Sequence, residues 1–298
     1  MKIVEPEVTL IAKTETTLGL LADEFIPQAG MSGLETLTEF AGRSCYQSFN
    51  RPNPATNTTD KYLNRTLFEQ GHWSIAEHAS VTFYITGVSR AFTHELVRHR
   101  HLSYSQLSQR FVDESDTAIV IPPAVVDHSE NYPSAVSELQ EFAETALSVY
   151  EDVVEALQDN GFERKQAREA ARAVLPNMVE TRIVVTGNLR AWHEFCERRM
   201  KPDADAEMQQ VATMIYSKLN LVAPTIFPAV KETKKEDDEQ MRRFAKLIDL
   251  KEGAVISQDI YTYYKKDGFW REIDTPSLRY ASCTIAEGDD FLVIWEGE

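Results

Sequence analysis

Two segments that alternate apolar and polar side chains, at residues 80–86 and 179–186, constrain the fold of this chain more than any other feature of its sequence. In the first segment, Val81, Phe83 and Ile85 lie two residues apart, so in a strand their side chains point to the same face. The second segment shows the same alternation. Both are therefore predicted to be strands with one buried face, in a fold that combines strands with helices.

The rest of the first 230 residues shows mainly helical periodicity. Apolar residues recur at the spacing of one helix face in segments 34–45 and 134–160. Helices are also predicted over 61–70, which Gly71 ends, over 89–99, which Ser89 can cap, over 163–174, which Pro176 ends, and over 188–200 and 204–221. A further strand is predicted over residues 2–14. Residues 119–133, with three prolines, are predicted to be a loop, and residues 101–112 show no clean period.

The composition changes after residue 230. Residues 231–240 (KETKKEDDEQ) are nearly all charged, which is typical of a solvated linker or helix start. Strand-like runs follow at 255–264, 270–273 and 291–295, with Lys266-Asp267-Gly268 as a hairpin turn. The chain is therefore predicted to have a main domain, residues 1–230, followed by a charged linker and a small β-rich C-terminal extension, residues 231–298.

The charge balance limits the possible partners. Asp and Glu number 47 and Lys and Arg 31, which gives a net charge of −16. A field of this sign repels nucleic acid polymers and anionic membranes, so neither is predicted as a partner. The apolar runs are too short to cross a bilayer, the acidic N-terminal segment does not resemble a signal peptide, and the three cysteines form no CxxC pair. The expected location is therefore the reducing cytoplasm.

Against this acidic background, residues 98–110 (RHRHLSYSQLSQR) form a cluster of hydrogen-bond donors. The segment contains three arginines, two histidines, three serines and two glutamines, and no acidic residue. Arginine guanidinium groups and serine hydroxyls are suited to bind phosphate. The segment is therefore interpreted as a site for a small anionic ligand, although scattered cations at the end of a surface helix would give a similar composition.

A second motif, His94-Glu95-Leu96-Val97-Arg98-His99, is close to the HExxH pattern of zinc hydrolases. Its two histidines are five residues apart, however, which places them about 140° apart around a helix. They cannot bind one metal ion from the same helix, so no metal site is predicted.

The basic segment also carries a family signature. Arg98-His99-Arg100, followed after seven residues by Ser108, resembles the signature of the flavin-dependent thymidylate synthases. Similar blocks occur in the family's order within residues 35–228, namely Gly42-Arg43-Ser44, Gly71-His72 to Glu77-His78, Ala171-Arg172 to Leu175-Pro176, Gly187-Asn188 to Arg190, and Arg199. The residues after Lys231 fall outside this resemblance.

The resemblance implies a mixed α/β (α+β) fold, with a central twisted, largely antiparallel sheet flanked by long helices, in a homotetramer. It also implies binding of FAD and dUMP where subunits meet. The reaction would convert dUMP to dTMP, with methylenetetrahydrofolate as carbon donor and NADPH as reductant of the flavin. None of Cys45, Cys196 and Cys283 lies in a basic, catalytic-looking context, which agrees with a flavin route that needs no cysteine nucleophile.

Site residues follow from the resemblance, position by position. The flavin is expected to contact Ser74, Arg98, His99, Arg100, Gln106, Asn188 and Arg190. The nucleotide is expected to contact Glu95, Arg98, Gln106, Leu107, Ser108, Gln109, Arg110, Arg172 and Arg199, with Leu107 and Gln109 contributing mainly backbone amides. Arg199 is the expected catalytic residue, because its charge would polarise the uracil near N3.

Four residues depart from the family pattern. Glu194 stands where asparagine or histidine is usual near the flavin, Asp203 where histidine is common, and Ser105-Gln106 where Asn-Glu is frequent. Two other functions stay open: a catalytically inactive nucleotide- or flavin-binding regulator, and a phosphate-ester hydrolase that uses the arginine cluster. The hydrolase lacks an evident metal-ligand set or nucleophile–base pair.

Overall fold

The computed structural model describes residues 1–17, 25–50, 53–127, 132 and 134–229 with their side chains, and the backbone of four strands beyond residue 250. The chain forms two compact units, Met1–Ala229 and Val230–Glu298. The first unit contains every residue that the sequence assigns to a site.

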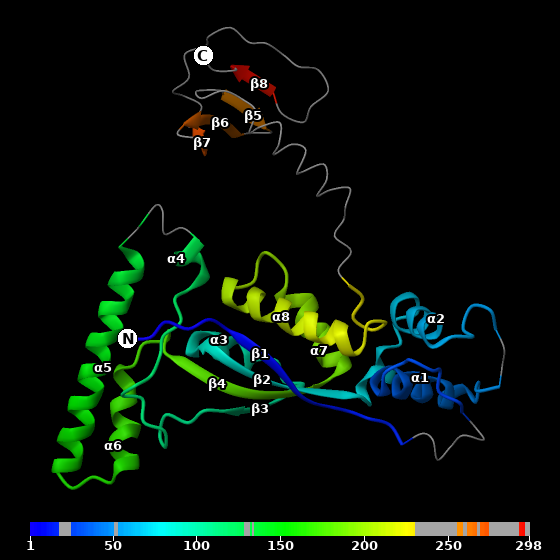
Figure 1. Cartoon of the computed structure of the whole chain (residues 1–298), viewed down its shortest axis with the longest axis horizontal. Coiled ribbons are helices and arrows are strands. Elements are labelled where there is room, and N and C mark those ends of the chain that lie inside the picture. Colours follow the sequence, from blue (N-terminus) through cyan, green and yellow to red (C-terminus); the bar gives the residue numbers. More distant parts are fainter. Residues whose placement is uncertain are drawn as a thin grey trace. The chain divides into compact units, whose positions relative to one another are not determined.

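A four-stranded antiparallel sheet forms the centre of the first unit (Figure 1). Its strands are ordered β1 (Glu7–Lys13), β2 (Ser80–Ser89), β4 (Glu180–Asn188) and β3 (Leu102–Gln106). The predicted alternation in β2 is confirmed, because Val81, Phe83 and Ile85 are 0% exposed. Next to these, the Thr82 and Thr186 hydroxyls of β2 and β4 form a cross-strand hydrogen bond of 2.9 Å.

Helices flank this sheet. They are α1 (Gly33–Tyr46), α2 (Thr59–Leu63), α3 (Arg90–Leu96), α4 (Pro123–Asp127), α5 (Ala135–Asp159), α6 (Arg164–Ala171), α7 (Leu189–Arg199) and α8 (Ala206–Val222), with the shorter turns η2 (Asn64–Glu69), η3 (Trp73–Glu77) and η4 (Arg172–Val174). Figure 1 shows α7 and α8 against one face of the sheet, α5 and α6 side by side at one end, and α1 and α2 at the other. The expected combination of an antiparallel sheet with long helices is thus confirmed.

Apolar side chains of α7 and α8 pack onto the sheet. Trp192 and Phe195 of α7 and Ile215 and Leu219 of α8 are fully buried in one cluster with the inward face of β2. The Trp192 indole N–H donates to the Val81 carbonyl at 3.1 Å, so the only polar atom of the ring is satisfied. Burial of one side chain of this size contributes about 1.5–3 kcal/mol, so these contacts fix the position of α7 on the sheet.

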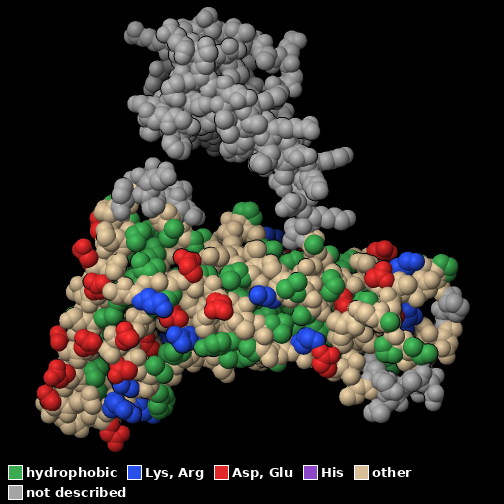
Figure 2. All heavy atoms as spheres, viewed as in Figure 1, with side chains coloured by type: hydrophobic (Ala, Val, Ile, Leu, Met, Phe, Trp, Pro, Cys, Tyr) green, Lys and Arg blue, Asp and Glu red, His purple; other side chains and the backbone are tan. Residues whose placement is uncertain are grey.

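Acidic side chains are concentrated on α5, which carries seven Asp or Glu residues and no lysine or arginine. On the face seen in Figure 2, acidic side chains are numerous over α5 and α6. The net charge of −16 is therefore unevenly distributed. With these charges α5 cannot cross a membrane, and no other helix within the described ranges is long and apolar enough to do so.

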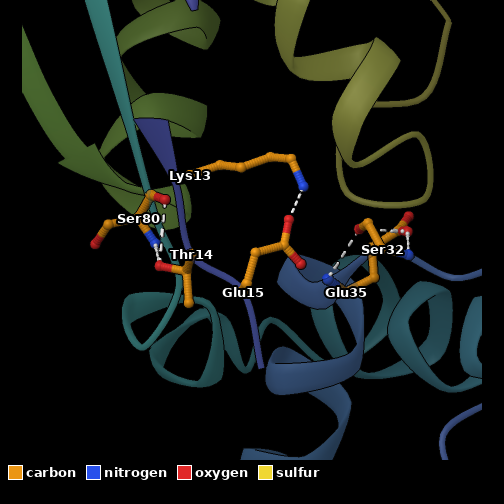
Figure 3. Close-up of polar contacts among 6 residues, drawn as sticks. All are labelled: Lys13, Thr14, Glu15, Ser32, Glu35 and Ser80. Carbon is orange, nitrogen blue, oxygen red and sulfur yellow. Dashed lines mark hydrogen bonds and ion pairs between the residues drawn. The ribbon is translucent and has the colours of Figure 1, made fainter. Parts of the chain in front are cut away.

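Polar contacts at the end of β1 and the start of α1 join distant parts of the chain (Figure 3). Ser32 and Glu35 form a capping box, in which Glu35 N donates to Ser32 Oγ at 3.3 Å and Ser32 N donates to Glu35 Oε2 at 3.2 Å. The buried Glu35 carboxylate also accepts from Thr225 N at 2.8 Å. Beyond β1, Thr14 N donates to the Ser80 carbonyl at 2.9 Å and its hydroxyl accepts from Ser80 N at 2.9 Å.

Several element boundaries differ from those predicted. Strand β3 lies within residues 101–112, where no period is evident, because this edge strand buries only Leu102. Helix α4 lies in the predicted loop and begins at Pro123, since the first helical residue needs no N–H. The helix predicted over 61–70 is divided into α2 and the π-helical turn η2, and the helix predicted over 163–174 ends in the 3-10 turn η4.

The second unit contains a separate antiparallel sheet. Its strands are ordered β7 (Phe269–Ile273), β6 (Tyr261–Lys266), β5 (Val255–Gln258) and β8 (Leu292–Trp295). The prediction of one strand over 255–264 is wrong, because β5 and β6 are two antiparallel strands with Val255 opposite Tyr264. Asp267 and Gly268 of the predicted turn, and the charged run 231–240, lie outside the described residues.

Candidate active site

Helix α3 leads into the basic segment. Ser89 caps the helix, because its Oγ accepts a hydrogen bond from Phe92 N at 2.9 Å. The buried Glu207 carboxylate accepts from Ser89 N at 2.7 Å and from Ser89 Oγ at 2.6 Å. The helix ends at Leu96 and not at about His99 as predicted, so the Arg-His-Arg sequence forms a turn between α3 and β3.

Tyr104 of β3 holds this turn in place. Its hydroxyl lies 2.7 Å from the carbonyl oxygens of both Leu96 and His99, and it donates to one of them at a time. Both carbonyls also accept a backbone N–H, Leu96 from His99 and His99 from Leu102, so the Tyr104 hydroxyl adds a further donor to the turn after α3. Burial raises the pKa of Tyr104, so its hydroxyl stays a donor.

Arg199, the last residue of α7, reaches this turn across a separation of 100 residues. Its Nε donates to His99 Nε2 at 2.9 Å, and its Nη1 donates to Glu95 Oε2 at 3.1 Å. The His99 ring packs edge-on against Phe195, with the ring centroids 5.0 Å apart. Three predicted site residues, Glu95, His99 and Arg199, are therefore in direct contact.

A pocket of about 630 Å³ lies between the Arg-His-Arg turn and α7. It is lined by Arg98, His99, Arg100, His101, Leu102, Ala191, Glu194, Arg198 and Arg199. Four of these nine residues are arginines and one is a carboxylate, so the pocket is a positive site in an acidic chain. Four predicted site residues, Arg98, His99, Arg100 and Arg199, line this one pocket.

A smaller pocket of about 220 Å³ adjoins the first. It is lined by Glu77, His101, Asn188, Arg190, Ala191 and Glu194, and shares three of these residues with the larger pocket. Asn188 caps α7, and Arg190 forms two ion pairs, from Nη1 to Glu77 Oε1 at 2.6 Å and from Nε to Glu194 Oε1 at 3.0 Å. The predicted site residues Asn188 and Arg190 therefore lie beside the larger group, and the departure Glu194 belongs to both pockets.

The predicted phosphate-binding residues form a separate group that lines neither of these pockets. Arg110 lies beside α6, with its Nε 2.9 Å from Glu169 Oε2, in an ion pair without the alignment of a hydrogen bond. Arg172 begins η4, directly after α6. The Leu107 amide donates to the Arg182 carbonyl at 2.9 Å, so it is already paired, contrary to the expectation that it is available to a ligand.

Arg90, which no sequence motif indicates, lies next to this group. Its Nη1 donates to the Leu107 carbonyl at 3.4 Å. Burial lowers its pKa, while Glu114 raises it and the positive charge of Arg172 lowers it further. Two partly buried arginines that repel one another are typical of an anion site. Arg90 stands alone between a capping serine and apolar residues, so the sequence carries no signal of this neighbourhood.

The remaining predicted residues lie elsewhere on the same scaffold. Gln106 Nε2 donates to Thr93 Oγ1 at 3.0 Å and to Thr181 Oγ1 at 3.3 Å, which directs this amide toward α3 and β4. Gln109 is buried, and Ser74 belongs to η3. None of the three predicted residues lines either pocket.

His99 is a neutral acceptor in this arrangement. Burial, followed by the charges of Arg199 and Arg198, lowers its pKa from 6.5 to about 4. We expect an NMR titration of the histidine side chains to give His99 a pKa near 4, with His99→Gln identifying its signal. Arg199→Gln is expected to raise that value, because it removes a neighbouring positive charge.

The same shift makes stability depend on pH. Between pH 6.5 and about 4, His99 takes up a proton in the unfolded chain but not in the folded one. The free energy of unfolding therefore decreases as the pH falls through that window. A titration of His99 at or above 6.5 in the wild-type protein would contradict the contact with Arg199.

Comparisons with known proteins identify the family of this chain. Residues 29–225 match the family described as thymidylate synthase complementing protein. The chain is 47% identical over 233 residues to the flavin-dependent thymidylate synthase of Mycobacteroides abscessus, which covers 76% of this chain and 90% of that protein. It is 48% identical over 228 residues to the protein of the same name from Mycobacterium tuberculosis, covering 74% of this chain and 88% of the relative. This chain is therefore an enzyme that belongs to the flavin-dependent thymidylate synthase family.

Proposed function

We propose that this enzyme converts dUMP to dTMP, with methylenetetrahydrofolate as the carbon donor and a bound FAD that NADPH reduces. The observation that supports this most is the meeting of the Arg-His-Arg turn with Arg199 in one arginine-lined pocket. The larger pocket, with four arginines and one carboxylate, provides a positively charged site for an anionic cofactor, and the smaller pocket extends it. The separate group at Arg110 and Arg172 provides a site for a phosphate.

The residues of the two pockets fit a flavin dinucleotide. FAD carries a diphosphate, and its reduced ring carries negative charge, so guanidinium and amide donors are the groups it requires. We assign its binding to Ser74, Arg98, His99, Arg100, Gln106, Asn188 and Arg190. When bound, the flavin supplies the reducing equivalents of the reaction.

We assign the nucleotide phosphate to Ser108, Arg110 and Arg172, and add Arg90 to this group because of its position. Ser108 provides a neutral donor, and each arginine provides a fork of N–H groups that matches phosphate oxygens. Glu95, Arg98, Gln106, Gln109 and Arg199 complete the proposed nucleotide contacts. For Leu107 we propose only van der Waals packing against the nucleotide, because its amide already donates to the Arg182 carbonyl.

We propose that Arg199 stabilises the negative charge that develops on the uracil. His99 and Glu95 hold its guanidinium by two of its five N–H donors, which leaves the others for a ligand. Because His99 is neutral, it fixes the orientation of Arg199 without adding a repelling charge. A donor held in place before the reaction needs little reorganisation when charge appears, which is the main source of electrostatic catalysis.

No cysteine nucleophile is part of this proposal. Cys196 is buried on α7, and burial raises the pKa of its thiol, which keeps it protonated and unreactive. Cys45 is exposed near the end of α1, a helix that contributes no residue to the arginine-lined pocket. Cys283 lies outside the described residues.

We further propose that residues 1–230 carry the catalytic function and that 231–298 is an extension that affects stability or assembly. The proposed assembly is a homotetramer with FAD and dUMP bound at subunit interfaces, located in the cytoplasm. The net charge of −16 supports the absence of nucleic acid polymers and anionic membranes among its partners.

The function is tested with the purified full-length chain. It should show the absorption of an oxidised flavin, and its reduced flavin should be reoxidised by methylenetetrahydrofolate only when dUMP is present, with dTMP as product. Protein that is colourless and takes up no added FAD would contradict the proposal. Binding of flavin and dUMP without formation of dTMP would favour the regulator, and release of inorganic phosphate would favour the hydrolase.

Ser108→Ala is expected to be milder than Arg110→Ala. The serine variant loses one neutral hydrogen bond, at a cost of about 1 kcal/mol, whereas the arginine variant loses a charge-assisted contact of about 2–3 kcal/mol. Both losses should appear mainly as weaker dUMP affinity, measured by titration of the FAD-loaded enzyme. Complete inactivity of Ser108→Ala with unchanged FAD and dUMP binding would instead indicate that Ser108 is a covalent nucleophile.

A further inference from the structure

Arg190 lies between two carboxylates at the junction of the two pockets. Its Nη1 is 2.6 Å from Glu77 Oε1 and its Nε is 3.0 Å from Glu194 Oε1. Both carboxylates raise the pKa of Arg190, Glu194 more than Glu77, as expected for a cation that they stabilise. Arg190 is the one arginine that lines the smaller pocket. Its positive charge is permanent, and these two carboxylates already neutralise it.

Two elements bring these groups together. Glu194 is one helical turn after Arg190 on α7, where residues four apart face each other. Glu77 is the last residue of η3, and this turn is held against α7 by the Trp73 ring, which stacks on His193 with the centroids 3.8 Å apart. The arrangement is therefore built by packing and does not depend on a chance meeting of long side chains.

The ion pairs can be broken by a competing anion. The side chains of Arg190, Glu77 and Glu194 are 42%, 46% and 37% exposed, so water screens their attraction. A ligand diphosphate that enters the pocket carries two negative charges, one more than a carboxylate, and offers Arg190 several acceptor oxygens. Arg190 then has two alternative partners, one within the protein and one in the ligand.

We propose that Glu77 and Glu194 compete with the flavin for Arg190, and thereby set a lower affinity for the cofactor than the arginine-lined pockets would otherwise give. The inference rests on the proposed function, since it takes the flavin as the anion that enters these pockets. Glu194, which departs from the family pattern, is on this account a specificity-determining residue for cofactor affinity. Glu194 pairs with Arg190 when the cofactor is not bound, and it does not contact the reacting atoms.

The test measures the dissociation constant of FAD from flavin-stripped, full-length protein by the change in flavin fluorescence. Glu194→Gln should bind FAD about two- to fivefold more tightly than the wild type, the range expected for release of one exposed ion pair. Glu77→Gln should act in the same direction. Glu197→Gln is the matched control, because it removes the same charge from an exposed position of α7 that lines neither pocket, and its affinity should stay close to that of the wild type.

An Arg190→Gln background separates competition from simple repulsion. If the carboxylates act through Arg190, Glu194→Gln no longer tightens FAD binding once the arginine is gone. Equal tightening in both backgrounds would show direct repulsion of the cofactor and overturn the proposal, as would unchanged or weaker binding by Glu194→Gln alone. A wild-type protein that binds no FAD would instead contradict the proposed function itself.

Discussion

Replacing Arg199 with alanine is expected to lower turnover by about 10²–10³ while the protein keeps its FAD and most of its affinity for dUMP. The expected loss is large because the proposed contact strengthens as charge develops on the uracil, so its removal affects the transition state more than the bound substrate. Steady-state assays should therefore show a fall in kcat with little change in KM. Flavin absorbance of the same sample reports whether the cofactor is retained.

Two variants sharpen this test. Arg198→Ala removes a neighbouring charge from the same pocket, but Arg198 makes neither of the contacts to His99 and Glu95 that hold Arg199, so its effect should be smaller. Arg199→Lys keeps the charge and loses the fork that spans the two partners, so its turnover should lie between those of alanine and wild type. Turnover of Arg199→Ala within a few-fold of the wild type would exclude the proposed role.

The elements that the sequence predicts well are those with local causes. Strand β2 is recognisable because alternate residues such as Val81 and Phe83 are fully buried. Helices α3 and α7 are recognisable because Ser89 and Asn188 accept hydrogen bonds from backbone amides three residues later. In each case the residues that determine the element lie within it or directly before it, so a short window of sequence contains the information.

Elements with distant causes are not predictable in this way. Strand β3 is defined by pairing with β4, for example Leu102 with Gly187, and Leu102 is the one residue of the strand that is buried. The turn that ends α3 depends on Tyr104, whose hydroxyl reaches back to the Leu96 carbonyl. Neither signal has a period that a sequence window could detect.

The candidate site also has parts with local causes, which the sequence predicts, and parts with distant causes, which it does not. The Arg98–Arg100 turn is a compact motif, and its resemblance to a family led to Arg199 in the same pocket. The partners of the site arginines could not be foreseen from spacing, because Glu77 and Arg190 are separated by 113 residues and meet only when η3 packs on α7. Arg90 escaped notice for the same reason: its neighbour Arg172 belongs to another element.

The Gly42-Arg43-Ser44 block, which resembles the family pattern, has a structural role in this chain. Arg43 is buried on α1, where its Nε donates to Glu39 Oε1 at 2.6 Å and its Nη2 donates to the Thr56 carbonyl at 2.6 Å. The guanidinium also lies over the Tyr62 ring, 4.4 Å from its centroid. A Cβ at Gly42 would clash with the Tyr62 hydroxyl, so any larger residue there would displace the Tyr62 side chain of α2.

Arg43→Met is therefore expected to destabilise the fold by about 3–5 kcal/mol. Methionine fills a similar volume, but it leaves the Glu39 carboxylate, 4% exposed, without its cation. The remaining hydrogen bond from Thr59 Oγ1, at 2.6 Å, does not compensate a buried charge. The measurement is the midpoint of unfolding by denaturant, followed by the tryptophan signal of the full-length protein.

The double variant Glu39→Leu/Arg43→Met shows whether the cost comes from the unpaired charge. With both ionic groups removed, no carboxylate is left buried, so the double variant should be more stable than Arg43→Met alone, even though it lacks one more native side chain. If the losses of stability in the two single variants add up to the loss in the double variant, the ion pair itself contributes nothing to stability. The destabilisation by Arg43→Met would then come from the lost hydrogen bonds of Arg43 to Ser48 and Thr56. Arg43 would then stabilise the loop whose Ser48 and Thr56 carbonyls it binds, and the stability of α1 itself would depend on its capping box and apolar face.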